Sequence, residues 1–365
     1  MNIFFLSHTE DGGIYKVGSH HLSREFSKMG NKVTHISTPI SFPQLLIGKG
    51  SRSRIDQAKN GAFQDKNGVI QIVDKIPFPL RILNQNVIIS HQLISHGILE
   101  ADFILMDQPL FAPALSKLDL KGKIIYRPTD VYLEGSMVES QKVALKIADG
   151  VIATSHTVLN NLNINSDLPK HVEENGVEFY RFYSKPSKIN NRDNVVYLGS
   201  LDERFDWGLI RYLAIKFSDL KFDLYGTIRN FDPRNNNDEN SIILPPNIRL
   251  LGPVPYEEVP YILKKYKIGL LPFVNNELNQ GRSPMKLYEY LASGLNVVSL
   301  RTRTLEQLNL PCVELYDNTK NACIALEKAN KLNNSSILGV ESAKKQDWSN
   351  KTKSILNFMK TIEGT

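Results

Sequence analysis

The sequence predicts an α/β protein built from two Rossmann-like, doubly wound domains with a cleft between them. In both halves of the 365-residue chain, apolar segments of strand length alternate with segments of helical spacing, a pattern typical of a mostly parallel sheet with helices on both faces. A polar segment, residues 183–194, separates the halves as a linker, and the length suits two domains of ordinary size. Ligands of such sheets bind beyond the carboxyl ends of the strands, so we expect the site between the two domains.

The first half shows the alternation from its first residues. Residues 2–7 are an apolar strand, and residues 14–30 have a helical spacing of apolar side chains that ends at Gly30. Residues 139–150 predict a second helix. Further strands are expected at 31–38, 68–76, 101–109, 121–130 and 151–155.

The second half repeats the pattern after the linker. Short apolar runs that end at Gly or Pro predict buried parallel strands, and the segments between them have helical spacing. The strands are expected at 195–200, 221–227, 248–254, 268–273 and 295–300. The helices are expected at about 206–217, 256–265, 284–293 and 320–332, followed by an amphipathic helix over 347–363.

Composition narrows the class of protein. Hydrophobic residues make up 41% of the chain and charged residues 22%, which indicates a globular fold. The net charge of +6 permits an anionic ligand or membrane surface, but no nucleic-acid-binding motif occurs, so we expect no nucleic acid partner. Cys312 and Cys323 fit neither a disulfide framework nor a metal site. No signal peptide or spanning segment is expected, so a cytoplasmic location is predicted.

The most informative helix of the second half begins near Ser283. We expect this residue as the N-cap, Pro284 as the first helical residue and Gly294 as the residue that ends the helix. Lys286 then lies in the first turn, where the helix dipole disfavours a cation, and Glu289 lies on the same face. A helix N-terminus with a lysine suits a diphosphate, and the carboxylate can accept hydrogen bonds from a ribose diol. On spacing alone, an exposed Lys–Glu pair explains the same pattern.

The segment SPMKLYEYLASGLNVVSL resembles the nucleotide-binding segment of GT-B glycosyltransferases, including group 1 (GT4-like) members. In that segment a lysine holds the donor diphosphate and an acidic residue binds the ribose, and Lys286 and Glu289 match these positions. Segments 197–210 and 247–273 are also similar to the family's nucleotide domain. The resemblance implies a donor site for a nucleotide diphosphate-sugar, UDP-linked. The expected donor contacts are Gly199, Ser200, Gly226, Pro253, Val254, Ser283, Met285, Lys286 and Glu289.

The same architecture implies that the last helix, around residues 348–359, crosses back to the first domain. We therefore expect an acceptor domain over residues 1–185 together with 346–365. The donor domain is expected over residues 186–345.

One position departs from the family pattern. Many retaining members carry a second glutamate eight residues before the one that Glu289 matches. Here that position is Gly281, and Glu277 is out of register. This departure favours an inverting reaction.

The first half supplies a candidate general base. Asp130 follows an apolar strand in the segment IIYRPTD. An inverting transferase needs a base to deprotonate the acceptor hydroxyl. The segment is similar to a YRxSD stretch of the xanthan-pathway glucuronosyltransferase family, which implies this role for Asp130. A loop or capping aspartate is the alternative interpretation, and Asp107, at the end of another strand, is a rival base.

A glycine-containing loop follows the first strand. Gly12, Gly13 and Tyr15 precede a helix N-terminus, and the glycines allow close backbone approach to a donor sugar or acceptor. The loop lacks GxGxxG, so no dinucleotide fingerprint is present. A tight strand–helix turn is an equal alternative.

A basic, partly apolar segment suggests a membrane partner. Between Lys16 and Arg81 the chain has eleven Lys and Arg against four Asp and Glu, with the apolar run ISFPQLLIG among them. Such a segment suits an anionic leaflet, and an ordinary solvated loop is the alternative. The expected location is therefore cytoplasmic, at the inner face of a membrane.

Together these features predict a glycosyltransferase that moves a sugar from a UDP-sugar to a saccharide acceptor, lipid-linked, in surface polysaccharide synthesis. Inversion with Asp130 as the base is the favoured mechanism. A retaining GT4-like transferase and a UDP-sugar epimerase of the same fold are the alternatives. No DxD triplet occurs, so no metal and no cofactor beyond the UDP-sugar co-substrate are expected.

Overall fold

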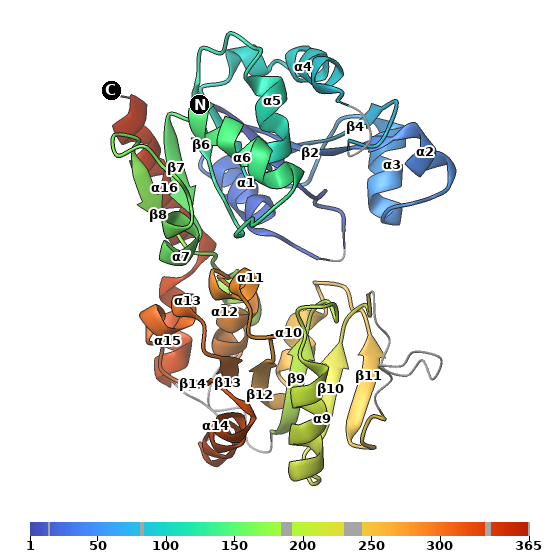
Figure 1. Ribbon diagram of the computed structural model, residues 1–365, viewed down its shortest axis with the longest axis vertical. Helices are drawn as coiled ribbons and strands as arrows, with labels where there is room; N and C mark the ends of the chain where they lie inside the picture. Colours follow the sequence, from blue (N-terminus) through green and yellow to red (C-terminus); the bar gives the residue numbers. More distant parts are fainter. Residues whose placement is uncertain (14, 81–83, 184–191, 230–242, 333–336, 364–365) are drawn as a thin grey trace. The chain divides into compact units, whose positions relative to one another are not determined.

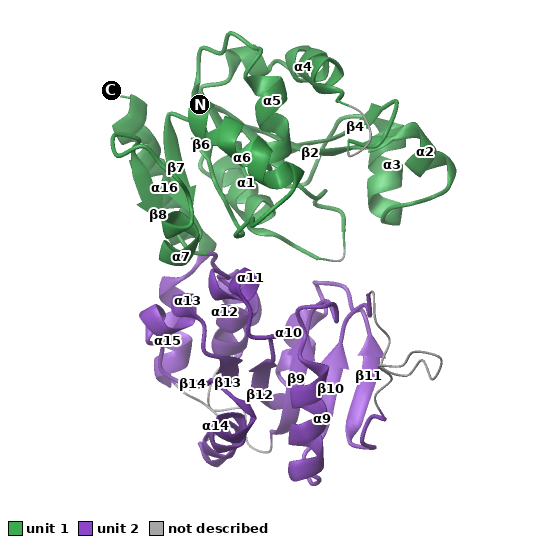
Figure 2. Ribbon diagram, viewed as in Figure 1, with its two compact units in different colours: residues 1–174, 348–365 green, residues 175–347 purple. Residues whose placement is uncertain are grey.

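The computed structural model describes residues 1–13, 15–80, 84–183, 192–229, 243–332 and 337–363 (Figure 1). The chain divides into two compact units, which Figure 2 shows in different colours. Unit 1 comprises Met1–Glu174 and Trp348–Thr365, and unit 2 comprises Asn175–Asp347. Most of the predicted linker, residues 184–191, lies outside the described residues.

The division falls about eleven residues before the predicted one at 185/186. The reason is packing: Phe179 and Phe182 belong to the hydrophobic core of unit 2. Val177 forms a parallel bridge to Asp347, and the Phe179 amide donates to the Asp347 carboxylate at 3.0 Å. The segment that starts at Asn175 is therefore an integral part of unit 2 and not a tail of unit 1.

Unit 1 contains an eight-stranded sheet in the order β3-β4-β2-β1-β5-β6-β7-β8 among the described residues. All neighbours are parallel except β3 and β4. The order reverses between β1 and β5, which marks the switch point where ligands of such sheets bind. The strands are β1 Asn2–Ser7, β2 Lys32–Ser41, β3 Phe63–Gln64, β4 Ile70–Ile76, β5 Phe103–Met106, β6 Lys123–Tyr126, β7 Gly150–Ala153 and β8 Lys170–Val172.

Helices cover the sheet of unit 1, and the last helix of the chain is one of them. Trp348, at its start, stacks on His21 with the ring centroids 5.0 Å apart, which fixes it against the first helix. The helices of unit 1 are α1 Gly18–Lys28, α2 Phe42–Leu46, α3 Arg52–Asn60, α4 Asn86–Ser95, α5 Ala112–Leu115, α6 Ser136–Ile147, α7 His156–Asn160 and α16 Trp348–Glu363, with 3-10 turns Ile98–Glu100 and Pro109–Phe111.

Unit 2 contains a six-stranded, fully parallel sheet in the order β11-β10-β9-β12-β13-β14 among its described residues. This order also reverses, between β9 and β12. The strands are β9 Asp193–Leu198, β10 Phe222–Tyr225, β11 Ile248–Gly252, β12 Tyr266–Leu271, β13 Asn296–Leu300 and β14 Val313–Tyr316. The helices are α8 Phe179–Phe182, α9 Trp207–Lys216, α10 Val259–Leu263, α11 Glu277–Gln280, α12 Met285–Ala292, α13 Arg303–Leu308, α14 Thr319–Lys331 and α15 Ile337–Lys345.

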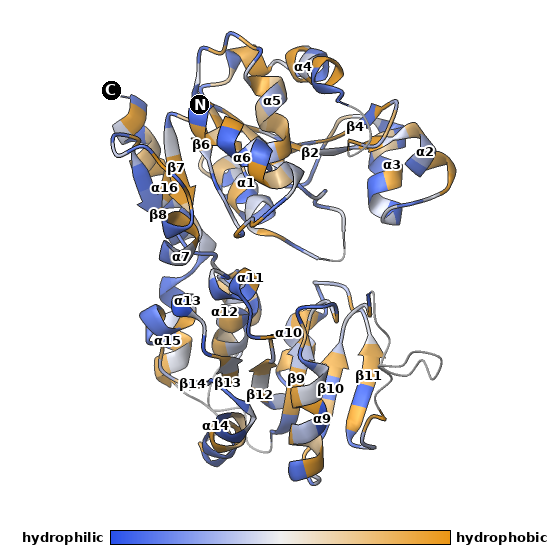
Figure 3. Cartoon of the chain, in the orientation of Figure 1, coloured by the Kyte–Doolittle hydropathy of each residue, from blue (hydrophilic) through white to orange (hydrophobic). Residues whose placement is uncertain are grey.

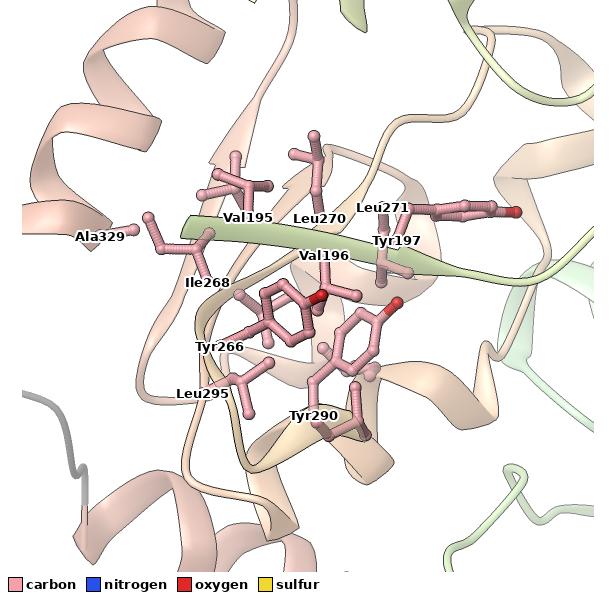
Figure 4. Packing of buried hydrophobic residues seen from close by; sticks show 14 of the residues in the cluster. Val195, Val196, Tyr197, Tyr266, Ile268, Leu270, Leu271, Tyr290, Leu295 and Ala329 are labelled. Carbon is pink, nitrogen blue, oxygen red and sulfur yellow. The ribbon is translucent and has the colours of Figure 1, made fainter. Parts of the chain in front are cut away.

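The core of unit 2 forms on both faces of its sheet. Val195, Val196 and Tyr197 of β9 are all buried, because a central parallel strand is covered on both sides. Figure 4 shows Tyr290 of α12 packed close to these residues. A Cβ at Gly269 would lie 2.2 Å from the Tyr290 ring. The helix that carries the candidate site is therefore held tightly against the sheet.

Candidate functional site

The carboxyl ends of three strands meet closely in unit 2. The Gly199 amide donates to the Tyr225 carbonyl, and the Gly226 amide donates to the Gly252 carbonyl, both at 2.8 Å. A Cβ at Gly226 would lie 1.7 Å from the Gly199 carbonyl oxygen. Position 226 therefore has room only for glycine, and the ends of β9 and β10 form a closely packed backbone surface there.

Lys286 lies directly over this surface. A Cβ at Gly199 would be 2.3 Å from Lys286 Cε and 2.8 Å from Nζ. The ammonium group therefore occupies the space that a side chain at position 199 would fill. The sequence analysis predicted both residues as donor contacts, and the structure brings them together.

The start of α12 differs by one residue from the prediction. The helix begins at Met285 with Pro284 as its N-cap, and Ser283 does not cap it. Instead the Ser283 hydroxyl accepts a hydrogen bond from the Asn175 amide at 3.0 Å, and its carbonyl accepts from the Asn175 side chain at 2.9 Å. Ser283 thus ties the start of α12 to the first residue of unit 2.

Lys286 lies among other charges. Burial lowers the pKa of Lys286 to about 8, nearby Arg282 and Arg204 lower it further, and Glu289 and Asp202 oppose the shift. Arg204 is held by the Asp202 carboxylate, its Nε donating at 2.7 Å. The charges of Arg204 and Arg282 therefore both act on Lys286, and Asp202 offsets part of them. The sequence analysis missed Arg204 and Arg282, because only the fold brings the loop after β9 to the start of α12.

Glu289 lies one turn deeper, and only 6% of its surface is exposed. Burial raises the pKa of Glu289 to about 7, nearby Glu178 raises it further, and Lys286 opposes the shift. Burial and the carboxylates of Glu289 and Glu178 also raise the pKa of buried Tyr256. A surface Lys–Glu pair, the alternative interpretation from spacing, does not fit this burial.

The remaining predicted donor contacts lie in the same unit. The Ser200 carbonyl accepts a hydrogen bond from the Tyr197 hydroxyl at 2.8 Å, which shapes the loop after β9. Met285 is partly exposed at the start of α12, and Pro253 and Val254 follow β11 with at least part of their surface exposed. All of them lie at carboxyl ends of strands or at the start of α12.

Glu277 is engaged elsewhere. Its carboxylate accepts from the Arg303 guanidinium at 2.7 Å, and its side chain is 57% exposed. The matched position, Gly281, has no carboxylate. Glu277 therefore does not replace the second glutamate of the retaining pattern in this structure.

The two candidate bases of unit 1 have different surroundings. Asp107 is 2% exposed, and it accepts a hydrogen bond from the buried Arg127 guanidinium at 2.9 Å. Burial raises the pKa of Asp107. Asp130, in the loop after β6, is partly exposed and accepts from the Thr129 hydroxyl at 3.2 Å. Asp130 is thus more exposed than Asp107, whose carboxylate is part of a buried ion pair.

The loop after β1 is held in place by contacts within unit 1. A Cβ at Gly12 would lie 2.0 Å from the Ser53 hydroxyl of α3, so close approach to that helix explains the glycine. A Cβ at Gly13 would lie 3.2 Å from the Glu10 carboxylate. Asp11 anchors the loop through ion pairs with Lys16 and Arg24 at 2.9 and 2.7 Å. Tyr15 is partly exposed.

Comparisons with known proteins agree with the architecture. No family model matches the chain. The chain superposes over its full length on sucrose-phosphate synthase from Thermosynechococcus elongatus, with a TM-score of 0.72, 12% identity and 100% of both chains covered. It superposes equally well on HepE from Anabaena in complex with UDP and glucose, with a TM-score of 0.70, 15% identity and 99% of both chains covered. At these identities the comparisons establish the fold, which is the GT-B fold predicted from the sequence.

One sequence relative adds to this. A protein named for teichuronic acid biosynthesis, the glycosyltransferase TuaH of Bacillus subtilis (strain 168), is 28% identical to this chain over 156 residues. The match spans 40% of this chain and 38% of that protein.

Two features are absent from the described residues. No helix there has the length and apolar character needed to cross a membrane. No group of three or more His, Cys, Asp or Glu side chains there is arranged to hold a metal ion.

Proposed function

We propose that the protein is a glycosyltransferase that moves a sugar from a UDP-sugar to a saccharide acceptor on a lipid carrier. The observation that carries this proposal is the position of Lys286, at the start of α12 and against the backbone at Gly199. The charges of Arg204 and Arg282 also act on Lys286. A diphosphate is the ligand that such a combination of cations and a helix N-terminus favours.

The donor would bind with its diphosphate against Lys286. Its two phosphates would add negative charge beside Lys286, where Arg204 and Arg282 disfavour the ammonium form. The Glu289 carboxylate would accept hydrogen bonds from the ribose diol, and the backbone at Pro253 and Val254 would flank the base. The fold is shared with HepE, which was crystallised with UDP and glucose, and this likeness supports a uridine nucleotide.

The proposed acceptor class is supported by a sequence relative. The name of TuaH, a relative over part of the chain, concerns teichuronic acid biosynthesis. This supports an acceptor in the synthesis of a surface polysaccharide.

For the reaction itself we propose direct displacement with inversion. Asp130 would take the proton of the acceptor hydroxyl while its oxygen attacks the anomeric carbon of the donor. The bond from that carbon to the β-phosphate oxygen would break, and UDP would leave with its new negative charge stabilised by Lys286 and the two arginines. Position 281 carries glycine where retaining members carry a second glutamate, which supports inversion, and the partly exposed Asp130 supports its role as the base.

A screen of UDP-, GDP- and TDP-sugars by thermal shift tests the donor class. We expect a UDP-sugar to raise the melting temperature most, because a ligand that binds only the folded state stabilises it. Stabilisation by GDP- or TDP-sugars alone would contradict the uridine assignment.

Release of UDP, measured with and without saccharide acceptors, separates the reaction classes. A transferase releases UDP in an acceptor-dependent manner, whereas an epimerase converts its donor without any acceptor. NMR of the product anomer then distinguishes inversion from retention. A product with the donor's anomeric configuration would overturn the role of Asp130 as the base of a single displacement.

A further inference from the structure

A protruding segment of unit 1 combines exposed apolar and cationic side chains. It consists of α2, α3 and the short edge strand β3, residues 42–64, beside the outer strand β4 of the sheet (Figure 1). We call this the rim segment. The sequence analysis predicted no helices here, but two helices form, each with a serine that caps its N-terminus.

The helix α2 presents apolar side chains outward. Its inner side chain, Leu45, packs with Ile55 on a small cluster that contains Ile40. Phe42 is 51% exposed, Leu46 87% and Ile47 73%. Scattered single apolar residues on a surface need no explanation, but three within six consecutive residues form a patch that is consistent with a binding surface.

Cations surround this patch. Arg52 is 97% exposed, and its nearest anion, Asp56, lies 3.9 Å away on the same helix. Lys49, Lys59 and Lys66 are also exposed. Figure 3 shows the hydrophobic α2 beside the hydrophilic α3 at the rim of unit 1.

The structure also shows which of the basic residues counted in the sequence do not contribute. Lys16 and Arg24 are largely buried and paired with Asp11. The Arg54 guanidinium donates to the Thr38 and Pro39 carbonyls at 2.6 and 3.1 Å. Within the rim segment the exposed cations are therefore Lys49, Arg52 and Lys59.

We infer that the rim segment docks on an anionic lipid surface, with Phe42, Leu46 and Ile47 inserted among the acyl chains and Lys49 and Arg52 at the level of the headgroups. Apolar side chains flanked by cations gain both from burial at the interface and from attraction to acidic lipids. The exposed cations beside the apolar patch complement acidic lipid headgroups, and this pairing favours an anionic membrane over an uncharged apolar partner. The inference does not depend on the proposed reaction, because docking needs neither donor nor acceptor.

Co-sedimentation of the full chain with vesicles of phosphatidylglycerol and phosphatidylcholine tests the inference. We expect binding to these vesicles at low salt, and weak binding to vesicles of phosphatidylcholine alone. The affinity for these vesicles should fall at least about tenfold in the variant Leu46→Ser/Ile47→Ser and in the variant Lys49→Gln/Arg52→Gln. All four side chains are exposed, so we expect both variants to melt at the temperature of the unchanged protein.

A matched control is available in unit 2. Ile215 and Lys216 of α9 are also exposed, an apolar residue beside a cation. The variant Ile215→Ser/Lys216→Gln should bind vesicles as the unchanged protein does. The inference is wrong if the unchanged protein does not sediment with anionic vesicles, or if the control variant loses binding as much as the rim variants do. Unchanged thermal stabilisation by UDP-sugars in the rim variants would show that donor binding is unaffected.

Discussion

Lys286 and Glu289 lie one turn apart on α12. Burial shifts the pKa of each in the direction that favours its neutral form. The pKa of Lys286 is lowered to about 8 and that of Glu289 is raised to about 7. A bound diphosphate would stabilise the ammonium form of Lys286. Binding of UDP should therefore be coupled to the uptake of a proton wherever Lys286 is neutral in the free protein.

This coupling predicts a pH dependence of UDP affinity. Below pH 8 Lys286 is already charged, and the affinity should vary little because of this group. Above pH 8 the free protein loses the proton that the complex needs, so the affinity should fall by about tenfold per pH unit. Calorimetric titrations between pH 7 and pH 10 measure this slope. The Lys286→Ala variant should lack it, and a slope that persists in this variant would assign the proton to another group.

Substitution by asparagine should affect turnover at Asp130 and folding stability at Asp107. Asp130→Asn should keep UDP affinity and folding stability but lower the rate of UDP release with acceptor by about a hundredfold or more. Asp107→Asn weakens the buried pair with Arg127, so the free energy of unfolding should fall by about 3 kcal/mol. Urea denaturation and turnover assays of the two variants check both outcomes. If Asp130→Asn retains full turnover, the base lies elsewhere.

Single site residues could be predicted from the sequence where they lie on one helix. Lys286 and Glu289 could be predicted because their spacing and the start of α12 are local features. Arg204 could not, because its proximity to Lys286 depends on how the loop after β9 packs on α12. Ser283 was predicted in the right place with the wrong role, since its partner, Asn175, is distant in the sequence.

Among the elements, the strand ends at Gly199 and Gly226 shape the candidate donor site. The close approach of Gly226 to the Gly199 carbonyl leaves no room for a methyl group. The backbone surface below Lys286 therefore depends on glycine at position 226.

Gly226→Ala should destabilise the protein and weaken UDP binding together. The new methyl group would force β9 and β10 apart, and we expect a loss of about 1–3 kcal/mol in the free energy of unfolding. Gly208→Ala is the matched control, because its Cβ would meet only the Asp206 carboxylate at 3.4 Å, in α9. Thermal melts with and without UDP measure both effects. Equal stability of the two variants would contradict the close packing of these strand ends.

Most central strands and long helices could be predicted, because apolar runs and 3.6-residue spacing are strong local signals. The helix expected at 206–217 is Trp207–Lys216, and the one expected at 320–332 is Thr319–Lys331. Several of the elements missed are short or at sheet edges, such as β3 and β14, or polar, such as α3, but the apolar helix α4 was missed as well. Packing against the sheet, more than their own sequence, holds these elements in place.

For the whole molecule, the two-domain fold followed from the repeated βα alternation, but the position of the domain boundary did not. Composition placed it in the polar segment 183–194, whereas the core of unit 2 begins with the segment after Glu174. The signal for this is two phenylalanines, Phe179 and Phe182, whose burial in unit 2 depends on the folded sheet.

Calorimetric titration of UDP into the unchanged protein and into Lys286→Ala tests the proposed donor site most directly, with Lys216→Ala as the control. Loss of a charged contact to the diphosphate should weaken UDP binding by roughly ten- to a hundredfold in Lys286→Ala. Lys216 is exposed on α9, so its removal should leave the affinity unchanged. Equal UDP affinity in all three proteins, or no UDP binding by the unchanged protein, would contradict the assignment of Lys286 to the donor diphosphate.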